Sequence, residues 1–228
     1  MAAGRSMTPF YVGLGVVAVA GAALIGRAAL RPRAVPLTTD TVAPLASGPR
    51  GVTLGSDSAP VEIMEFSDFE CPYCARFAVL NMPDLRARLI EPGRVRWRFI
   101  HYPLQGHTKS PTAHLAAACA NEQGRFWQLH DLIYERQGDW TESRDLVGAL
   151  RTLAVQAGVD RARFDQCMEQ RSAWGRVLAD KSLGDSLGIN GTPTFYVNGR
   201  ALPDVPSFDR LRAIVDSLAP ARAAAPGR

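Results

Sequence analysis

The sequence predicts an α/β domain that is interrupted by an all-helical subdomain and preceded by an apolar segment typical of a signal-anchor helix. A β-branched apolar run, a Cys-x-x-Cys motif and a helix-compatible run occupy residues 61–90, and an alternating run follows at 94–102. About eighty residues of helical pattern come next, before strand signals return at 194–202. A parallel crossover needs only a dozen or so residues, so the surplus indicates an inserted helical subdomain.

Charge is distributed unevenly along the 228 residues. The net charge is +4, and residues 1–50 account for all of it with five arginines and one aspartate. Residues 51–228 carry 21 basic and 21 acidic side chains, so no basic face is implied and nucleic-acid binding is not expected. The hydrophobic fraction of 46% is ample for a packed core.

Residues 1–30 indicate export. Residues 6–26 carry no charge, and an apolar run rich in glycine and alanine lies between Arg5 and Arg27. Its length lies between that of a usual signal-peptide core and that of a bilayer span, so a cleaved signal peptide and an uncleaved signal-anchor both remain open, with the anchor favoured. Residues 31–50 hold four prolines and no helical period, which predicts a linker.

The globular part is expected to begin near Gly51 with a short edge strand at 51–54. Residues 61–66 then predict a strand, and residues 74–90 predict a helix kinked by Pro83. Residues 94–102 alternate in polarity and predict a second strand. Strand, helix and strand in this order form a βαβ unit with a parallel pair.

The helical pattern of the insert contains recognisable start and stop signals. Residues 110–137 predict two helices that meet near Gly124. The next helix ends at Gly158, and Asp160 is suited to cap a further one. One more helix is expected at 174–187.

Strand signals then return. The run 194–197 predicts a strand, and Asn198-Gly199 is typical of a hairpin turn into residues 200–202. Ser207 is expected to cap the last helix.

The four cysteines divide into one close pair, Cys71 and Cys74, and two isolated residues, Cys119 and Cys167. A four-cysteine zinc site usually takes its ligands from two close pairs, so zinc is disfavoured. At a helix start, free backbone N–H groups and the helix dipole favour a thiolate, and Pro72 suits the first helical turn. The close pair therefore predicts a redox dithiol; an inert disulfide or two core thiols are the alternatives.

The segments Phe69-Glu70-Cys71-Pro72-Tyr73-Cys74 and Gly191-Thr192-Pro193-Thr194-Phe195, with the helical insert between them, resemble the DsbA-like branch of the thioredoxin superfamily. The resemblance covers roughly residues 51–220. It implies a thioredoxin fold with its first half at 51–107, the helical insert at 108–188 and its second half at 189–220. Residues 221–228, which lie outside the resemblance, are expected to form a disordered tail.

The resemblance also implies roles for single residues. Cys71 is expected to be the exposed nucleophile, with Cys74 as its resolving partner. Pro193 is expected to be a cis-proline that faces the dithiol, which leaves the backbone of Thr192 free to pair with a substrate peptide. Glu65 matches the acidic residue beneath the dithiol, where it would exchange a proton with Cys74; a strand glutamate reaching solvent is the alternative.

Pro72 and Tyr73 are expected to tune the redox potential, because Pro-Tyr stands where DsbA has Pro-His. The missing imidazole, together with nearby Asp68 and Glu70, should raise the pKa of Cys71 relative to DsbA and make the disulfide less oxidising.

Cys119 and Cys167 are predicted to form a structural disulfide, with two unpaired core thiols as the alternative. The four histidines lack helical ligand spacing and indicate no metal; each is expected to be a surface or hydrogen-bonded residue. They are His101, His107, His114 and His130.

These features together predict an extracytoplasmic thiol–disulfide oxidoreductase that introduces disulfides into exported proteins. Its expected partners are unfolded or reduced exported proteins and a membrane redox partner that reoxidises the dithiol. Membrane contact is expected through the N-terminal segment, and no metal or organic cofactor is implied. The alternatives are a disulfide isomerase or reductase of the same fold, and a non-catalytic module that binds a client or copper(I). The isomerase is disfavoured because the linker has no room for a dimerisation domain.

Overall fold

The structure is a computed structural model that describes residues 50–219. The expected signal peptide or signal-anchor, nearly all of the linker and the tail at 221–228 lie outside the described residues. Among the helices within residues 50–219, none combines the length and apolar character needed to cross a membrane.

The described residues form a five-stranded sheet of order β1-β3-β2-β4-β5. Central strand β2 pairs in parallel with β3 and antiparallel with β4, and β1 and β5 are added antiparallel at the two edges. The strand bounds are Val52–Leu54 (β1), Val61–Ser67 (β2), Val95–His101 (β3), Thr194–Val197 (β4) and Arg200–Ala201 (β5). The parallel β2–β3 pair confirms the βαβ unit, and β4 and β5 form the expected hairpin.

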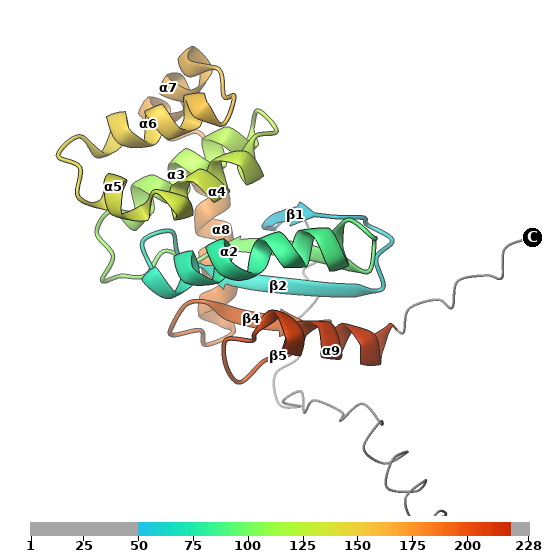
Figure 1. Cartoon of the computed structure of the whole chain (residues 1–228). Coiled ribbons are helices and arrows are strands. Elements are labelled where there is room, and N and C mark those ends of the chain that lie inside the picture. Colours follow the sequence, from blue (N-terminus) through green and yellow to red (C-terminus); the bar gives the residue numbers. More distant parts are fainter. Residues whose placement is uncertain (1–49, 220–228) are drawn as a thin grey trace, which may run out of the picture. The chain divides into compact units, whose positions relative to one another are not determined.

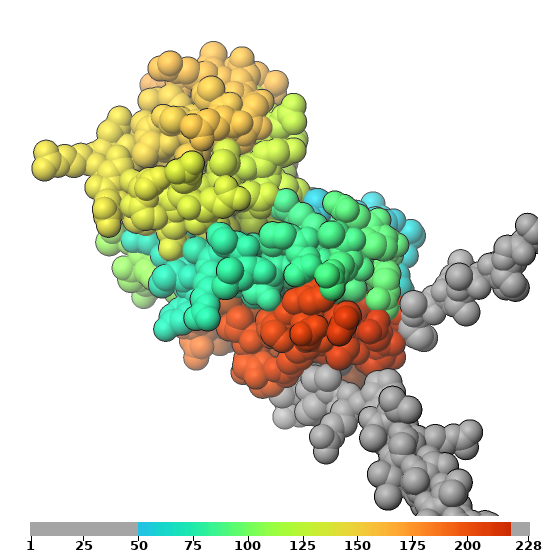
Figure 2. Space-filling view, in the orientation of Figure 1, coloured from blue at the N-terminus to red at the C-terminus, as the bar shows by residue number. Residues whose placement is uncertain are grey.

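Alternation along β2 assigns its side chains to the two faces of the sheet. On one face lies helix α2 (Pro72–Leu85), whose Phe77 ring contacts the rings of Trp97 and Phe195. On the other face, Phe66 belongs to a buried cluster with Leu183 of helix α8 (Trp174–Ser186). Figure 2 shows α2 running along the surface between the helical insert and the last helix, α9 (Phe208–Leu218).

The helix after the Cys-x-x-Cys motif differs from its predicted bounds at both ends. It begins at Pro72, because proline fits the first turn of a helix. Its α-helical part ends at Leu85, and Arg86–Ile90 (η1) form a π-helical turn. Pro83 lies within α2 and cannot donate the usual backbone hydrogen bond, so the regular ladder is interrupted just before this turn.

The insert consists of helices packed at one end of the sheet (Figure 1). Their bounds are Ser110–Asn121 (α3), Phe126–Glu135 (α4), Gln137–Thr141 (α5), Leu146–Gln156 (α6) and Arg161–Gln170 (α7), and α8 leads back to the sheet. The expected disulfide is present: Cys119 of α3 is bonded to Cys167 of α7, with their Cα atoms 5.8 Å apart.

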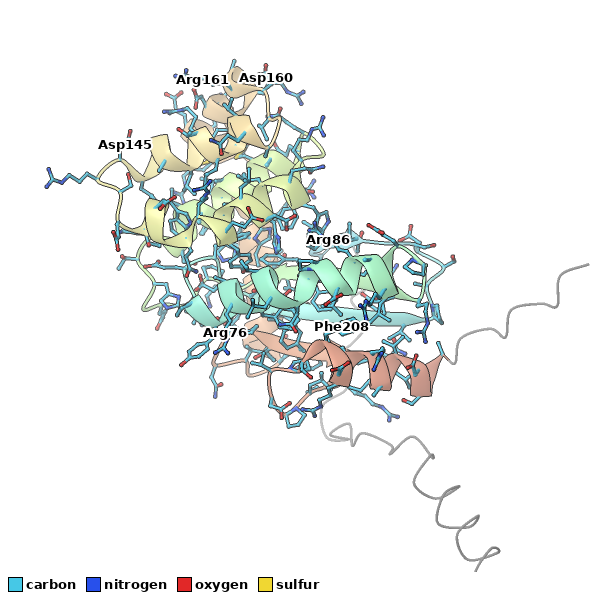
Figure 3. The ribbon with its side chains drawn as sticks, in the orientation of Figure 1. Arg76, Arg86, Asp145, Asp160, Arg161 and Phe208 are labelled. Carbon is cyan, nitrogen blue, oxygen red and sulfur yellow. A yellow bond between two sulfur atoms is a disulfide. The ribbon has the colours of Figure 1, made fainter. Side chains whose placement is uncertain are left out.

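Side-chain caps explain several helix starts. Asp145 and Asp160, at the N-terminal ends of α6 and α7 (Figure 3), accept hydrogen bonds from backbone N–H groups three residues on. Ser207 does the same for α9. Gly158, just after α6, has φ +81°, a conformation that favours glycine at a helix end. These local signals are the reason why the helix limits could be predicted.

Helix α8 joins the insert to the sheet. The buried carboxylate of Asp180 accepts hydrogen bonds from the backbone N–H groups of Gly51 and His101. Gly184 allows close packing, because a Cβ atom there would lie 2.5 Å from the Tyr102 ring. The Tyr102 hydroxyl lies 2.5 Å from Ile189 O and 3.0 Å from Asp185 Oδ1, and it donates its single proton to these two acceptors together. The insert and the sheet are therefore joined through buried polar contacts as well as apolar ones.

Candidate active site

The Cys-x-x-Cys motif lies where β2 leads into α2. Cys71 is the N-cap residue, with extended backbone angles (φ −74°, ψ 121°), and its N–H donates to Asp68 O. Cys74 lies one helical turn further on, and both cysteines are free thiols in this structure. The Thr192–Pro193 peptide bond, just before β4, is cis as expected.

The Cys71 thiol is covered rather than exposed, which corrects the expectation for this residue. Only 4% of Cys71 is accessible. Its Sγ lies 3.3 Å from the carbonyl oxygen of Thr192, so the loop before the cis-proline covers the sulfur. Pro72 and Tyr73 are exposed instead, with Tyr73 67% accessible. Cys71 is therefore covered by the Thr192–Pro193 loop, whereas its neighbour Tyr73 lies at the surface.

The two thiols are shifted in opposite directions. A hydrogen bond from the Cys74 thiol is the main cause that lowers the pKa of Cys71 to about 6, and burial opposes it. Burial is the main cause that raises the pKa of Cys74 well above its ordinary value, and Cys71 and Glu65 raise it further. At neutral pH the reduced pair therefore consists of a Cys71 thiolate and a neutral Cys74 thiol.

Glu65 lies on the sheet face that α2 covers and is 1% accessible, so the solvent-reaching alternative is wrong. Its carboxylate accepts hydrogen bonds from Ser67 Oγ at 2.8 Å and from Trp97 Nε1 at 3.2 Å. Burial is the main cause that raises its pKa to about 7, and these two hydrogen bonds oppose the shift. A carboxyl group with this pKa can both give and take a proton near neutral pH.

Asp68 and Glu70 form hydrogen bonds with the segment that leads into α3. Asp68 accepts hydrogen bonds from the N–H groups of Glu70 and Leu104 and from Ser110 Oγ. Glu70 accepts two hydrogen bonds from the N–H groups of Lys109 and Ser110, at the start of α3. The expectation that Asp68 and Glu70 raise the pKa of Cys71 relative to DsbA stays a prediction.

The sequence did not predict that three histidine side chains form a buried cluster. His101, His114 and His130 are each at most 2% accessible and surround the Phe69 ring. The Nδ1 atoms of His101 and His114 lie 2.8 Å apart, and burial is the main cause that lowers the pKa values of all three. The alternation of residues 94–102 could have indicated that His101 faces inward. His114 and His130 come from helices whose packing the sequence did not predict.

Gln137 of α5 is a second contact that the sequence did not reveal. Its side-chain amide donates to Phe69 O at 2.7 Å and to Cys71 O at 3.0 Å. The insert therefore fixes the backbone of the Cys71 turn directly. Within residues 50–219, no group of three or more histidine, cysteine, aspartate or glutamate side chains is arranged to bind a metal ion.

Comparison with known proteins places these features in a family. A family model described as thioredoxin matches residues 47–217. The probable disulfide bond formation protein D of Bacillus anthracis is 30% identical over 169 residues, covering 72% of this chain and 76% of that protein. The Na(+)/H(+) antiporter NhaA 3 of Salinispora tropica is 36% identical over 164 residues, or 72% of this chain, and the chain covers only 24% of that relative.

A solved structure with the same fold is that of oxidised BdbD from Bacillus subtilis. It has a TM-score of 0.63 and 24% sequence identity, and the match covers 74% of this chain and 92% of that one. The fold and the Cys-x-x-Cys pair define a thioredoxin-fold protein with a dithiol at the start of a helix. The chain belongs to the thioredoxin family.

Proposed function

We propose that this protein is an extracytoplasmic thiol–disulfide oxidoreductase that introduces disulfide bonds into exported proteins through Cys71 and Cys74. The observation that carries the proposal is the opposite shift of the two thiols, with the pKa of Cys71 lowered to about 6 and that of Cys74 raised. A stabilised Cys71 thiolate is a good leaving group, and this favours release of an oxidised substrate. Similarity to a protein named for disulfide bond formation supports this direction.

The reaction starts from the oxidised Cys71–Cys74 pair. A substrate thiolate attacks Sγ of Cys71, the Cys71–Cys74 bond breaks, and Cys74 leaves as a thiolate that takes up a proton. A second substrate thiolate then attacks the substrate sulfur of the mixed disulfide, and Cys71 leaves as a thiolate. The substrate has lost two electrons, which the reduced pair now holds until a membrane redox partner removes them.

Glu65 is suited to supply the proton that Cys74 takes up. The carboxyl group is buried on the α2 face and is close enough to raise the pKa of Cys74. The Thr192 backbone and the neighbouring Pro193 would align a substrate strand against the dithiol, while Pro72 and Tyr73, which are exposed, would tune the potential and contact the substrate. The N-terminal segment would hold the protein at the membrane.

The reduction potential of the Cys71–Cys74 pair tests the proposal. Equilibration of the purified protein with glutathione measures it, and we expect a value more negative than the about −120 mV of DsbA but closer to it than to the about −270 mV of thioredoxin. Refolding of a reduced, denatured disulfide protein should then proceed with catalytic amounts of the wild type and fail with the Cys71→Ser variant. A value near about −270 mV, as for thioredoxin, would mean that the protein works as a reductant.

A further inference from the structure

A continuous chain of side-chain hydrogen bonds leads away from the buried Glu65 carboxylate. Ser67 Oγ lies 2.8 Å from Glu65 Oε1 and also 2.8 Å from the hydroxyl oxygen of Tyr134. Glu65 and Ser67 are two residues apart on β2 and face the same side, whereas Tyr134 comes from α4 of the insert. Glu65 is 1% accessible and Ser67 is 0% accessible, so bulk water does not reach the Glu65 carboxylate directly.

The direction of these hydrogen bonds follows from the available protons. An ionised carboxylate only accepts, so Ser67 must donate to Glu65. Ser67 has one hydroxyl proton, and the Tyr134 hydroxyl must therefore donate to Ser67. Both donors point toward the carboxylate, which is the arrangement needed to return a proton to it. The other carboxylate oxygen accepts from Trp97 Nε1, which cannot give up its proton.

Tyr134 also forms part of the wall of a cavity between α2 and α4. The cavity has a volume of about 200 Å³, enough for several water molecules, and its polar lining includes Arg86 and Asp131. These two residues form an ion pair at 2.6 Å, and Arg86 lies on α2's continuation beside the insert (Figure 3). The exposed side chains of Val79 and Glu135 also line the cavity, so it is open to solvent.

We propose that Ser67 and Tyr134 form a proton path that reloads Glu65 from the cavity between α2 and α4. This inference rests on the proposed function, in which Glu65 gives a proton to the departing Cys74 thiolate. After that transfer, Ser67 passes its proton to the Glu65 carboxylate, Tyr134 passes its proton to Ser67, and a water molecule in the cavity replaces the proton of Tyr134. One proton enters from solvent for each Cys74 thiol that forms.

The pH dependence of the path is set by Glu65. The titratable groups that face Glu65 and Tyr134 are Cys74 from α2, Asp68 after β2 and His130 from α4. Cys74 has a raised pKa and His130 a lowered one, so both remain neutral around pH 7. At a pH above the Glu65 pKa of about 7, most molecules begin a turnover with an ionised carboxylate and depend on the path.

Single-turnover reduction of the oxidised full-length protein by dithiothreitol tests the path. The rate is normalised to the dithiothreitol thiolate and measured at about pH 6 and about pH 8, on either side of the Glu65 pKa. We expect Ser67→Ala and Tyr134→Phe to slow the reaction at least about threefold at the higher pH and to stay within about twofold of wild type at the lower pH. Tyr196→Phe, which removes a hydroxyl on the opposite sheet face, should match wild type at both.

The two variants also distinguish a path from a passive hydrogen bond. The Ser67 hydrogen bond lowers the pKa of Glu65, so a purely passive role means that Ser67→Ala leaves more Glu65 protonated and speeds the reaction at the higher pH. That acceleration, or a Tyr134→Phe variant equal to wild type, would overturn the path. A slowing that is equal at both pH values would also overturn it. A wild-type protein with no activity toward dithiothreitol would instead overturn the proposed function.

Discussion

The chemistry of the dithiol depends on the surroundings of two sulfur atoms that are three residues apart. Cys71 lies at the N-cap position and receives a hydrogen bond from Cys74, whereas Cys74 is fully buried against Asp68 N–H and near Glu65. One sulfur is therefore stabilised as a thiolate and the other as a thiol. This asymmetry determines which sulfur leaves as a stable thiolate, Cys71, and which sulfur takes up a proton, Cys74.

The Cys74 thiol is expected to control the acidity of Cys71. Its hydrogen bond is the main cause of the lowered Cys71 pKa, so Cys74→Ala should raise that pKa from about 6 toward its ordinary value. Cys74→Ser keeps a donor and should raise it less. The pH dependence of thiolate absorbance in the reduced proteins measures both shifts. Equal pKa values in wild type, alanine and serine variants would contradict this cause.

Glu65 is expected to make the protein less stable as the pH rises. Its pKa is raised from 4.5 to about 7 by folding, so the native state holds a proton that the unfolded state has already lost. The stabilising difference is present below about pH 4.5 and is lost by about pH 7, a change of about 3 kcal/mol in the free energy of unfolding.

Glu65→Gln should remove this part of the pH dependence. Denaturant unfolding of both proteins at about pH 4.5 and about pH 8 measures it, and the variant should gain stability relative to wild type at the higher pH. Asp180, whose pKa is raised to about 6, contributes a similar slope to both proteins and cancels in the difference. A difference between the two proteins that does not vary with pH would argue against a buried neutral Glu65.

Local sequence patterns predicted the site residues that are close along the chain or matched a known family. Cys71, Cys74 and the cis Pro193 come from such motifs, and the burial of Glu65 was one of two alternatives. The cover over Cys71, the Gln137 contact and the Ser67–Tyr134 hydrogen bond were not predicted. They join segments that are 66 to 121 residues apart, and only tertiary packing brings these together.

At the scale of elements, helix limits were predictable wherever a capping side chain or a terminal glycine marked them. Asp160, Ser207 and Gly158 are such markers, and the structure confirms all three. The helix after Cys71 was misjudged because Pro83 lies inside it and is followed by a π-helical turn. The response of the backbone to an internal proline depends on its tertiary contacts, which sequence periodicity does not report.

Helix α8 contains one glycine at a position with no room for a Cβ atom, Gly184, and one at a position with free space, Gly175. Gly184→Ala would place a Cβ atom 2.5 Å from the Tyr102 ring, which its hydroxyl contacts hold in place, so we expect a loss of about 1–3 kcal/mol in the free energy of unfolding. Gly175 has nothing within 4 Å of such an atom, and Gly175→Ala should be neutral or stabilising by up to about 1 kcal/mol. Denaturant unfolding compares the pair, and equal stability of the two variants would contradict close packing at Gly184.

At the scale of the whole described chain, buried polar contacts join the insert to the sheet, and we expect the two to unfold as one cooperative unit. Asp180 joins α8 to the backbone of β3, Gln137 joins α5 to the Cys71 turn, and Glu70 caps the start of α3 from the loop before α2. The turn that carries Cys71 is therefore bonded to two parts of the insert: Glu70 contacts the start of α3, and the backbone of Cys71 contacts α5. A change that loosens the packing of the insert should therefore also disturb the backbone that positions Cys71.

The Cys119–Cys167 disulfide tests this cooperativity. It closes a loop with a sequence separation of 48, so replacing both cysteines with alanine should lower the free energy of unfolding by about 2–4 kcal/mol. Single-tryptophan versions that retain either Trp97 of β3 or Trp140 of α5 report on the sheet and the insert separately. We expect both midpoints of denaturation to fall together. A shift for Trp140 alone would mean that the insert unfolds independently.

The same disulfide has a consequence for biosynthesis. Each new copy leaves the ribosome with its α3 and α7 cysteines reduced, and the bond between them is of the kind that the proposed activity makes. Under the proposed function, newly exported chains would therefore be substrates for mature ones, and the pool of active molecules would promote its own replenishment. Cells emptied of the mature protein should recover it slowly at first and then faster, as an autocatalytic process does.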